Sequence, residues 1–269
     1  MKTGILHTAA LALVMIAATA LRQAPAAVPE YTAVVVKTYP HDPAAFTEGL
    51  LYQDGFLYES TGRNGQSSIR KVALDSGNVV QQHDLDPRYF GEGIVTWKHR
   101  LVALTYKTEI GFVYDLDTFN QVSDFHYAGE GWGMTRDQSR LFMSDGTSDI
   151  RILDPESLHQ RGRIHVTCDG RAIKNINELE WIKGQIYANV WLSNVIVRIN
   201  PASGKVVGLI DVSNLLNLAA QDRAVDVPNG IAYDAATGRL FVTGKLWPTL
   251  YQITLSARPR ANGLCHNLP

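Results

Sequence analysis

The sequence carries little charge of either sign and almost no cysteine. Charged residues make up 19% of the 269 residues, the formal net charge is −1, and there are 2 Cys. A near-neutral chain without a basic block lacks the electrostatic footprint of a nucleic-acid-binding protein. Two cysteines are too few for a disulfide framework or a Cys-rich zinc module. The 45% hydrophobic content is that of a globular protein, which excludes a disordered chain or a coiled coil.

Signatures of metal, nucleotide and serine-hydrolase chemistry are also missing. The histidines are scattered through connecting segments and form no H-E-x-x-H or H-x-H spacing. There is no G-x-S-x-G elbow, no P-loop and no dinucleotide fingerprint. The sequence therefore predicts a protein that uses neither a metal nor a cofactor.

Long apolar runs are absent except at the N-terminus. Lys2 precedes an uncharged apolar run, Ala9–Leu21, which leads to small-residue exits at Ala18-Thr19-Ala20 and Ala24-Pro25-Ala26. This pattern is typical of a secretory signal peptide over residues 1–26, and the run is short of the roughly 20 residues that a membrane span needs. An uncleaved N-terminal anchor is the alternative. We expect an exported protein, periplasmic or secreted, with no membrane contact after signal removal.

The predicted export bears on whether the two cysteines are oxidised. An oxidising compartment would allow Cys168 and Cys265 to form a disulfide, but they could equally be two unrelated thiols. The sequence leaves the two possibilities open.

The rest of the chain is a repeat of short strands. Five segments begin alike, 40 to 52 residues apart, at Glu48-Gly49-Leu50, Glu92-Gly93-Ile94, Trp132-Gly133-Met134, Asn177-Glu178-Leu179 and Asn229-Gly230-Ile231. Each continues through a turn to a second strand, and the first four reach a third strand and a further turn. This period is that of a four-stranded propeller blade. Residues 27–269 are thus predicted to be one all-β domain, a five-bladed β-propeller with four antiparallel strands per blade.

The ends of the repeat predict how the ring closes. The fifth copy stops after Leu250–Leu255, which completes only its third strand, whereas the strand-like segment Tyr31–Tyr39 precedes the first copy. We expect this N-terminal strand to supply the missing outer strand of the last blade, since a closed ring leaves no open sheet edge. The irregular segment Ser213–Asp226 is predicted to contain a short helix.

Equivalent positions of a propeller converge on one end of its channel. The first positions of the copies and the ends of the second strands bring polar and aromatic residues to this mouth: Glu48, Glu92, Tyr106, Trp132, Asn177, Trp191, Asn229 and Lys245. Each has a simpler interpretation: a carboxylate that caps a strand end, a solvated lysine or a core tryptophan. Structural positions would more often be small or apolar, so the set is interpreted as a functional site.

Ordered motifs carry a resemblance to a known family. The chain resembles the plant and bacterial glutaminyl-peptide cyclotransferases (glutamine cyclotransferases) at Tyr39-Pro40-His41-Asp42-Pro43, Ala45-Phe46-Thr47-Glu48-Gly49-Leu50, Phe90-Gly91-Glu92-Gly93, Gly129-Glu130-Gly131-Trp132-Gly133, Asn177-Glu178-Leu179-Glu180, Ala188-Asn189-Val190-Trp191 and Val227-Pro228-Asn229-Gly230-Ile231. The likeness covers essentially all of the chain after the predicted signal peptide. Two positions depart from the family: Glu48 stands where plant members tend to carry Gln, and Tyr106 where Trp is expected.

The resemblance implies a metal-independent acyltransferase that converts the N-terminal glutamine of peptides or proteins to pyroglutamate and releases ammonia. It implies a site made of the catalytic residues Glu92, Lys245 and Asn177 and the substrate-binding residues Glu48, Tyr106, Trp132 and Trp191. We assign proton transfer to Glu92, oxyanion stabilisation to Lys245 and Asn177, and contact with the substrate α-ammonium to Glu48.

Two other functions fit the same architecture. A non-catalytic propeller would bind a peptide or glycan at this mouth without turnover. A calcium-dependent lactonase or lyase would need a cluster of Asp, Glu and Asn ligands at the axis, which the lysine and tryptophans fit poorly. The cyclase is preferred, acting as a monomer on peptide or protein substrates and on no nucleic acid.

Overall fold

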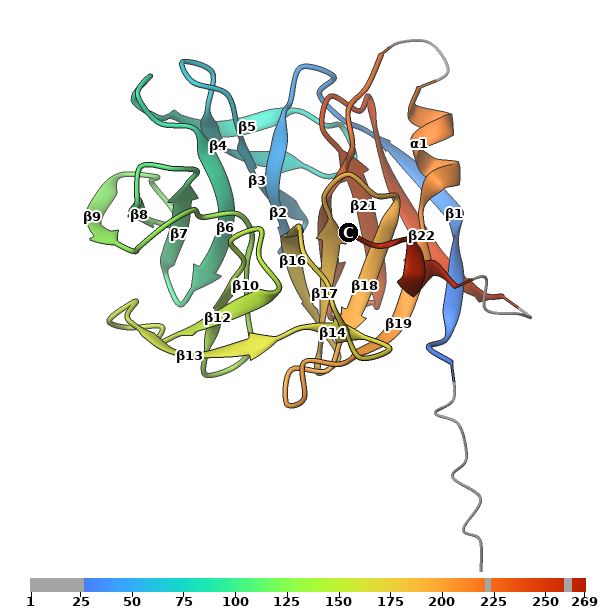
Figure 1. Ribbon diagram of the computed structural model, residues 1–269. Coiled ribbons are helices and arrows are strands. Elements are labelled where there is room, and N and C mark those ends of the chain that lie inside the picture. Colours follow the sequence, from blue (N-terminus) through green and yellow to red (C-terminus); the bar gives the residue numbers. More distant parts are fainter. Residues whose placement is uncertain (1–26, 221–223, 259–262) are drawn as a thin grey trace, which may run out of the picture.

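The fold was analysed in a computed structural model, which describes residues 27–220, 224–258 and 263–269. The predicted signal peptide, residues 1–26, lies outside the described residues. Within them the protein is all-β with one short α-helix (Figure 1). None of the described helices is long and apolar enough to cross a membrane.

Three separate four-stranded antiparallel sheets follow one another along the chain (Figure 1). The first contains β2 (Thr47–Gln53), β3 (Phe56–Thr61), β4 (Ser68–Ala73) and β5 (Val79–Asp84). The second contains β6 (Gly91–Trp97), β7 (Arg100–Thr105), β8 (Ile110–Asp115) and β9 (Gln121–His126). The third contains β10 (Met134–Arg136), β11 (Leu141–Met143), β12 (Asp149–Leu153) and β13 (Gln160–His165).

An eight-stranded sheet accounts for most of the remaining strands. Its order is β16-β17-β18-β19-β1-β22-β21-β20. The bounds are β16 (Ile176–Ile182), β17 (Gln185–Val190), β18 (Val195–Ile199), β19 (Val206–Asp211), β1 (Glu30–Pro40), β22 (Thr249–Ala257), β21 (Arg239–Gly244) and β20 (Pro228–Asp234). A small hairpin, β14 (Thr167–Cys168) with β15 (Arg171–Ala172), directly precedes β16 in the chain.

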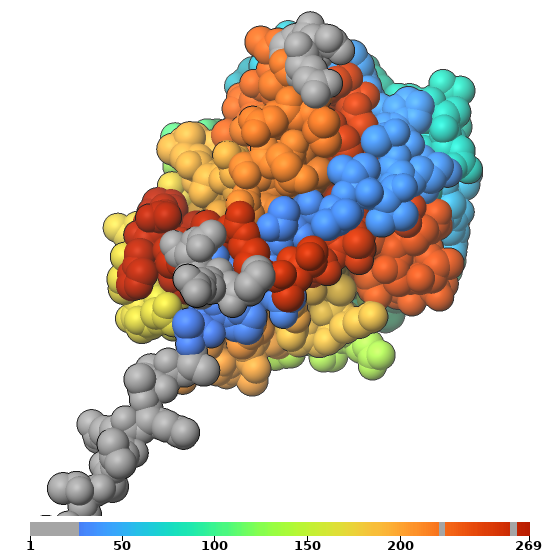
Figure 2. Space-filling model, turned by 90° about the vertical axis from the view of Figure 1, so that its right-hand side faces the viewer, coloured from blue at the N-terminus to red at the C-terminus, as the bar shows by residue number. Residues whose placement is uncertain are grey.

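The N-terminal strand pairs as the sequence predicts. β1 runs antiparallel to β22 from Tyr31 opposite Ala257 to Pro40 opposite Thr249, and pairs in parallel with β19 over three residues. In Figure 2 the blue N-terminal strand lies beside red C-terminal segments and the orange segment that includes α1 (Ser213–Ala219). The helix falls inside the irregular segment where one was expected, and the Asn214 side chain donates to the Ala33 carbonyl at 2.9 Å.

Burial falls from the inner strand of each sheet to the outer one. β2 is buried over its first five residues, whereas β5 and β9 are almost entirely exposed or half-buried. The apolar core fills the space between neighbouring sheets; one cluster joins Ile69 of β4 to Leu101 of β7 and Tyr114 of β8. Most residues of the inner strands are buried although several are polar, because neighbouring strands and sheets cover them.

The innermost strands contact one another in cyclic order: β2 lies against β6, β6 against β10, β10 against β16, β16 against β20, and β20 against β2. Two glycines of the repeat permit this approach. A Cβ on Gly93 would lie 2.5 Å from the Trp132 carbonyl oxygen, and one on Gly133 would lie 2.3 Å from the Asn177 carbonyl oxygen. Any larger residue would push the inner strands apart.

The cysteines, left open by the sequence, form a disulfide between Cys168 of β14 and Cys265 in the 3₁₀ helix η1 (Leu264–Asn267). Their Cα atoms lie 5.7 Å apart, and 97 positions separate them in the chain. The cross-link joins the C-terminal tail to the hairpin that precedes β16.

Candidate active site

A cavity of about 270 Å³ opens where the first strands of the sheets begin. All seven residues proposed from the sequence line it, together with four others: Phe46, Glu48, Phe90, Glu92, Tyr106, Trp132, Asn177, Trp191, Leu192, Asp226 and Lys245. Glu48, Glu92 and Asn177 lie near the starts of β2, β6 and β16, whereas Tyr106, Trp191 and Lys245 directly follow β7, β17 and β21. The chain thus brings segments almost 200 positions apart to one cavity.

Irregular strand pairing turns the polar residues toward this cavity. The register of the inner pairs shifts between Thr47 and Gly49, Gly91 and Ile94, Ile176 and Leu179, and Pro228 and Ile231. A β-bulge frees the residues inside it from the ladder and re-aims their side chains. Glu48, Glu92, Asn177 and Asn229 each lie inside one of these steps. The repeat therefore contains four equivalent bulges, and three of them present a cavity residue.

Glu48 and Lys245 form an ion pair deep in the cavity. The Lys245 ammonium lies 2.6 Å from Glu48 Oε1, and their side chains are 8% and 2% exposed, respectively. Asn229 does not line the cavity; its amide donates to Glu48 Oε2 at 3.2 Å and to the Thr47 carbonyl at 3.0 Å. The Lys245 ammonium also lies 4.6 Å from the centre of the Phe46 ring, a favourable cation–π position.

The second carboxyl group of the cavity belongs to Glu92, and its surroundings favour the protonated form. Burial raises the pKa of Glu92 well above its usual range, the negative charge of Glu48 raises it further, and Lys245 opposes both. Burial also raises the pKa of Glu48, to about 7, although Lys245 pulls it down. A hydrogen bond joins the two carboxyl groups. This hydrogen bond raises the pKa of Glu92 and lowers that of Glu48, as expected when the Glu92 carboxyl group donates and Glu48, already paired with Lys245, accepts.

A chain of aromatic rings forms the other wall. Neighbouring ring centres are 6.2 Å apart for Phe46 and Phe90, 5.7 Å for Phe90 and Tyr106, 6.4 Å for Tyr106 and Trp132, and 5.7 Å for Trp132 and Trp191. The planes of the Trp132 and Trp191 rings form an angle of 89°, which is an edge-to-face contact. Such a wall excludes water and strengthens the electrostatic interactions inside the cavity.

The sequence comparisons agree with one another. The model of the glutamine cyclotransferase family matches residues 7–255. The chain belongs to this family. It is 45% identical over 233 residues to a glutaminyl-peptide cyclotransferase of Arabidopsis thaliana, a match that covers 85% of this chain and 73% of the relative. Its fold resembles the crystal structure of a Myxococcus xanthus glutaminyl cyclase, with a TM-score of 0.81 and 35% identity over 86% of this chain and 99% of that one.

In the cavity of this glutamine cyclotransferase family member, the Asn177 side chain has a hydrogen-bond acceptor that is unpaired within the described part of the chain. The residue is 3% exposed, and its side-chain Oδ1 accepts no hydrogen bond from any described residue. Buried polar atoms in native proteins nearly always have a partner. An unpartnered amide oxygen that lines a cavity therefore marks a position where a bound polar group completes the hydrogen bonding.

Sequence reasoning missed four residues of the lining: Phe46, Phe90, Leu192 and Asp226. Phe46 and Phe90 each lie two positions before a glutamate of the quoted motifs, so their place in the repeat could have identified them. Leu192 is 66% exposed and has a φ of 64°, and no sequence pattern marks this conformation.

It also missed a buried ionic network behind the cavity. Glu59 accepts hydrogen bonds from His41 at 3.0 Å, Arg70 at 2.5 Å and Thr47 at 2.7 Å, and His41 Nδ1 lies 2.6 Å from the Trp247 carbonyl oxygen. Burial acts to lower the pKa of His41, but the Glu59 charge outweighs it and raises that pKa. The network ties the segment before Glu48 to the segment after Lys245. The motif around His41 therefore also supports the site.

Within residues 27–220, 224–258 and 263–269, no group of three or more His, Cys, Asp and Glu side chains is placed to hold a metal ion. The catalytic groups available in the cavity are the protonatable Glu92, the Glu48–Lys245 pair and the Asn177 amide. This arrangement can move protons and stabilise a developing oxyanion.

Proposed function

We propose that this chain is a glutaminyl-peptide cyclotransferase, which cyclises the N-terminal glutamine of a peptide or protein to pyroglutamate. The observation that carries the proposal is the buried Glu92 carboxyl group, whose pKa is raised, beside the Glu48–Lys245 ion pair in an aromatic cavity. Membership of the glutamine cyclotransferase family supports it. The cavity of about 270 Å³ suits one glutamine side chain with its α-amine.

The reaction is intramolecular. The substrate α-amine attacks the γ-carboxamide carbon, a nitrogen–carbon bond forms, the bond from that carbon to the amide nitrogen breaks, and ammonia leaves. Because both reacting groups belong to one residue, holding it in a folded conformer supplies much of the acceleration. Trp132, Trp191 and Tyr106 form the walls that hold this conformer and exclude water.

The raised pKa of Glu92 provides the neutral amine that attack requires. An α-ammonium has a pKa near 7.7–8.0 and an ordinary Glu near 4.3, so a proton would pass to an ordinary Glu in only about one complex in 3,000. Each unit by which burial raises the pKa of Glu92 increases that fraction about tenfold. Ionised Glu92 takes a proton from the α-ammonium, the neutral amine attacks, and Glu92 delivers that proton to the leaving nitrogen. As ammonia departs, the ring nitrogen gives its surplus proton to Glu92, which therefore acts as base, then acid, then base.

The remaining polar groups act on the carboxamide. The unpartnered Asn177 Oδ1 accepts an N–H of the γ-carboxamide, and the Asn177 amide N–H donates to its carbonyl oxygen. The Lys245 ammonium stabilises the oxyanion that forms on attack. Glu48 orients Lys245 and accepts the Glu92 hydrogen bond; direct contact between Glu48 and the α-ammonium stays a prediction, in competition with this pairing.

The cyclic contacts of the innermost strands support a five-bladed propeller over residues 27–269. In this description the eight-stranded sheet comprises two blades, β16–β19 and β20–β22, and β1 completes the second as its outer strand. The parallel pairing of β1 with β19 then joins neighbouring blades over three residues.

We further propose that the protein is exported and acts as a monomer. The Cys168–Cys265 disulfide supports export, because disulfides persist in oxidising compartments.

An ammonia-release assay tests the function. The purified protein is incubated with a peptide that begins with Gln and, as a matched control, with the same peptide acetylated at its N-terminus. We expect stoichiometric ammonia and pyroglutamate from the first peptide and none from the second, with activity retained after dialysis against EDTA. Binding of the first peptide without ammonia release would refute the cyclase and leave a peptide-binding propeller, whereas loss of activity with EDTA would refute the metal-free mechanism.

A further inference from the structure

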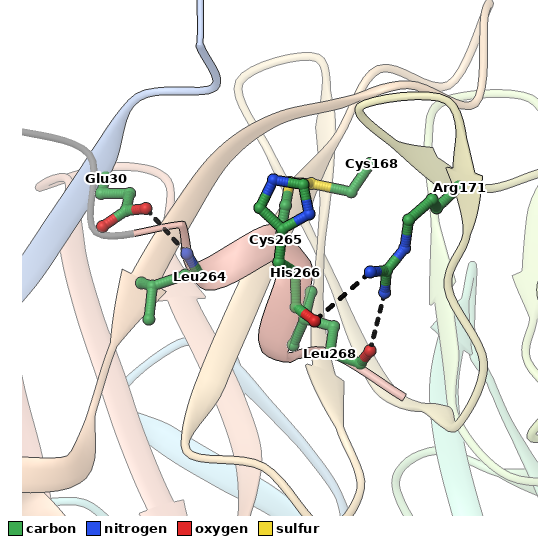
Figure 3. Close-up of a disulfide and its surroundings, with 7 residues drawn as sticks. All are labelled: Glu30, Cys168, Arg171, Leu264, Cys265, His266 and Leu268. Atoms are coloured by element: carbon green, nitrogen blue, oxygen red, sulfur yellow. Dashed lines mark hydrogen bonds between the residues drawn. A yellow bond between two sulfur atoms is a disulfide. The ribbon is translucent and has the colours of Figure 1, made fainter.

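The C-terminal tail folds back onto the segment that leads into the active site. The Cys168–Cys265 disulfide fixes it there, and both cysteines are buried, with 0% and 3% of their surface exposed (Figure 3). Leu268, 4% exposed, packs in the same apolar cluster as Ile173 and Ile176. Cys265 and Leu268 of the tail are thus part of the core that contains Ile176 of β16.

Hydrogen bonds fasten the tail along its whole described length. The Arg171 guanidinium donates to the His266 carbonyl at 3.3 Å and to the Leu268 carbonyl at 3.1 Å (Figure 3). The Leu264 N–H donates to Glu30 Oε1 at 2.9 Å, and the Lys174 N–H donates to the Pro269 carbonyl at 3.1 Å. The contact at Lys174 brings the end of the tail to within three positions of Asn177.

The segment that receives the tail also holds a cavity wall. Asn175, next to Lys174, has a left-handed φ of 59°; its N–H donates to the Gly146 carbonyl and its carbonyl accepts the Trp191 N–H, both at 2.8 Å. A non-glycine residue in this conformation persists only where its surroundings hold it. Two positions later Asn177 enters the cavity. One short segment therefore connects the tail with both Trp191 and Asn177.

We propose that the disulfide-fixed C-terminal tail is a positioning element of the active site, which holds residues 174–177 so that Trp191 closes the cavity wall and Asn177 faces the substrate. The inference rests on the proposed cyclase function and deepens it. Arg171, Cys168 and Cys265 act through this segment and touch no substrate. Without the tail, the segment around Asn175 loses the contacts that the tail makes with its neighbour Lys174. Substrate binding must then immobilise the Trp191 side chain in the cavity wall.

Two variants loosen the tail in different ways. Arg171→Leu removes two hydrogen bonds and keeps the disulfide, whereas the double variant Cys168→Ala/Cys265→Ala removes the cross-link. Arg161→Leu is the matched control, because Arg161 is exposed and, within the described residues, forms an ion pair only with Asp154. kcat and KM for a Gln peptide are measured at 25 °C, below the melting temperature of every variant, together with the pH profile.

We expect KM to rise about threefold to tenfold in the double variant, since a loosened side chain must be immobilised on binding, and to rise less in Arg171→Leu. The pH profile should not shift, because Glu48, Glu92 and Lys245 belong to other sheets or to the far strands of the same sheet. Arg161→Leu should keep the wild-type KM. A tail that only stabilises the fold would lower the melting temperature and leave KM unchanged, and that result would overturn the inference.

A second measurement separates failure of the inference from failure of the proposed function. Acrylamide quenching of Trp191 fluorescence, obtained as the difference between each protein and its Trp191→Phe counterpart, needs no turnover. Quenching should increase in both tail variants and not in Arg161→Leu. Absence of ammonia release from the wild type would refute the cyclase, and the quenching result would then still decide whether the tail positions Trp191.

Discussion

Replacing Glu92 with Gln should strongly reduce kcat while preserving the fold. Glu92 is 5% exposed and hydrogen-bonded to Glu48, and burial with the Glu48 charge raises its pKa well above the usual range. A glutamine has the shape of the protonated acid, stays neutral at every pH, and can donate the same hydrogen bond to Glu48. It cannot take a proton from the α-amine or return one to the leaving nitrogen.

The loss of proton transfer sets the size of the kinetic effect. General acid–base catalysis contributes typically 10²–10⁴-fold, so kcat should fall by about that factor, equivalent to about 3–5.5 kcal/mol of transition-state stabilisation. KM should change less, because the aromatic walls and Asn177 are intact.

The same substitution should also change how the free energy of unfolding depends on pH. Since the folded pKa of Glu92 lies above its unfolded value, the folded chain retains a proton that the unfolded chain releases. The stabilisation from this group is complete below the unfolded pKa and is lost as pH rises toward the folded pKa, at up to about 1.4 kcal/mol per pH unit. Glu92→Gln removes this contribution, so its free energy of unfolding should fall less steeply between pH 5 and 7.

Two assays on the same protein test these expectations. Ammonia release at saturating peptide gives kcat, and guanidinium unfolding at pH 5, 6 and 7 gives the slope of stability with pH. Glu156→Gln is the control, because Glu156 is a surface carboxylate paired with Lys98 at 2.6 Å and lines no part of the cavity. A kcat for Glu92→Gln within tenfold of the wild type, or an unchanged stability slope, would refute the assignment of Glu92 as the protonated catalytic acid–base.

Three further predictions concern Lys245, Glu180 and the disulfide. Lys245→Met leaves Glu48 buried without its cation; it should destabilise the fold by about 3–5 kcal/mol and move the pKa of Glu48 above about 7, which denaturant titration and a pH–rate profile would detect. Burial raises the pKa of Glu180 to about 8, so stability is lost as pH rises toward 8; Glu180→Gln should raise the melting temperature at pH 8 and hardly change it at pH 5, and equal shifts at both would contradict this. The double variant Cys168→Ala/Cys265→Ala should lose about 2–5 kcal/mol of unfolding free energy in guanidinium titration, and an unchanged midpoint would show that the cross-link does not stabilise the fold.

The sequence predicts the cavity lining well because the fold is repetitive. When each repeat folds in the same way, equal positions in the copies occupy equal positions around the axis. Glu48, Glu92 and Asn177 share one register and meet at one cavity although no two are closer than 44 positions. Pairing of the N-terminal strand with β22 follows from the same count of strands.

Contacts between repeats could not be predicted in this way. The repeat indicates that Glu48 and Lys245 approach one mouth, but it does not indicate that they pair at 2.6 Å or that burial raises the pKa of Glu92. These properties depend on burial and on distances of a few ångströms, which vary with side-chain rotamers and bulges. The His41–Glu59 contact and the disulfide likewise join segments that carry no shared pattern.

The sequence by itself determined the all-β repeat, the set of residues at the cavity and, through ordered motifs, the family. Periodic burial and turn chemistry are local properties, so they can be read along the chain. Only the tertiary structure decided the protonation of the carboxyl pair, the support behind the site and the attachment of the C-terminal tail to the segment before Asn177. Each of these depends on which groups exclude water from one another, and only the folded chain brings those groups together.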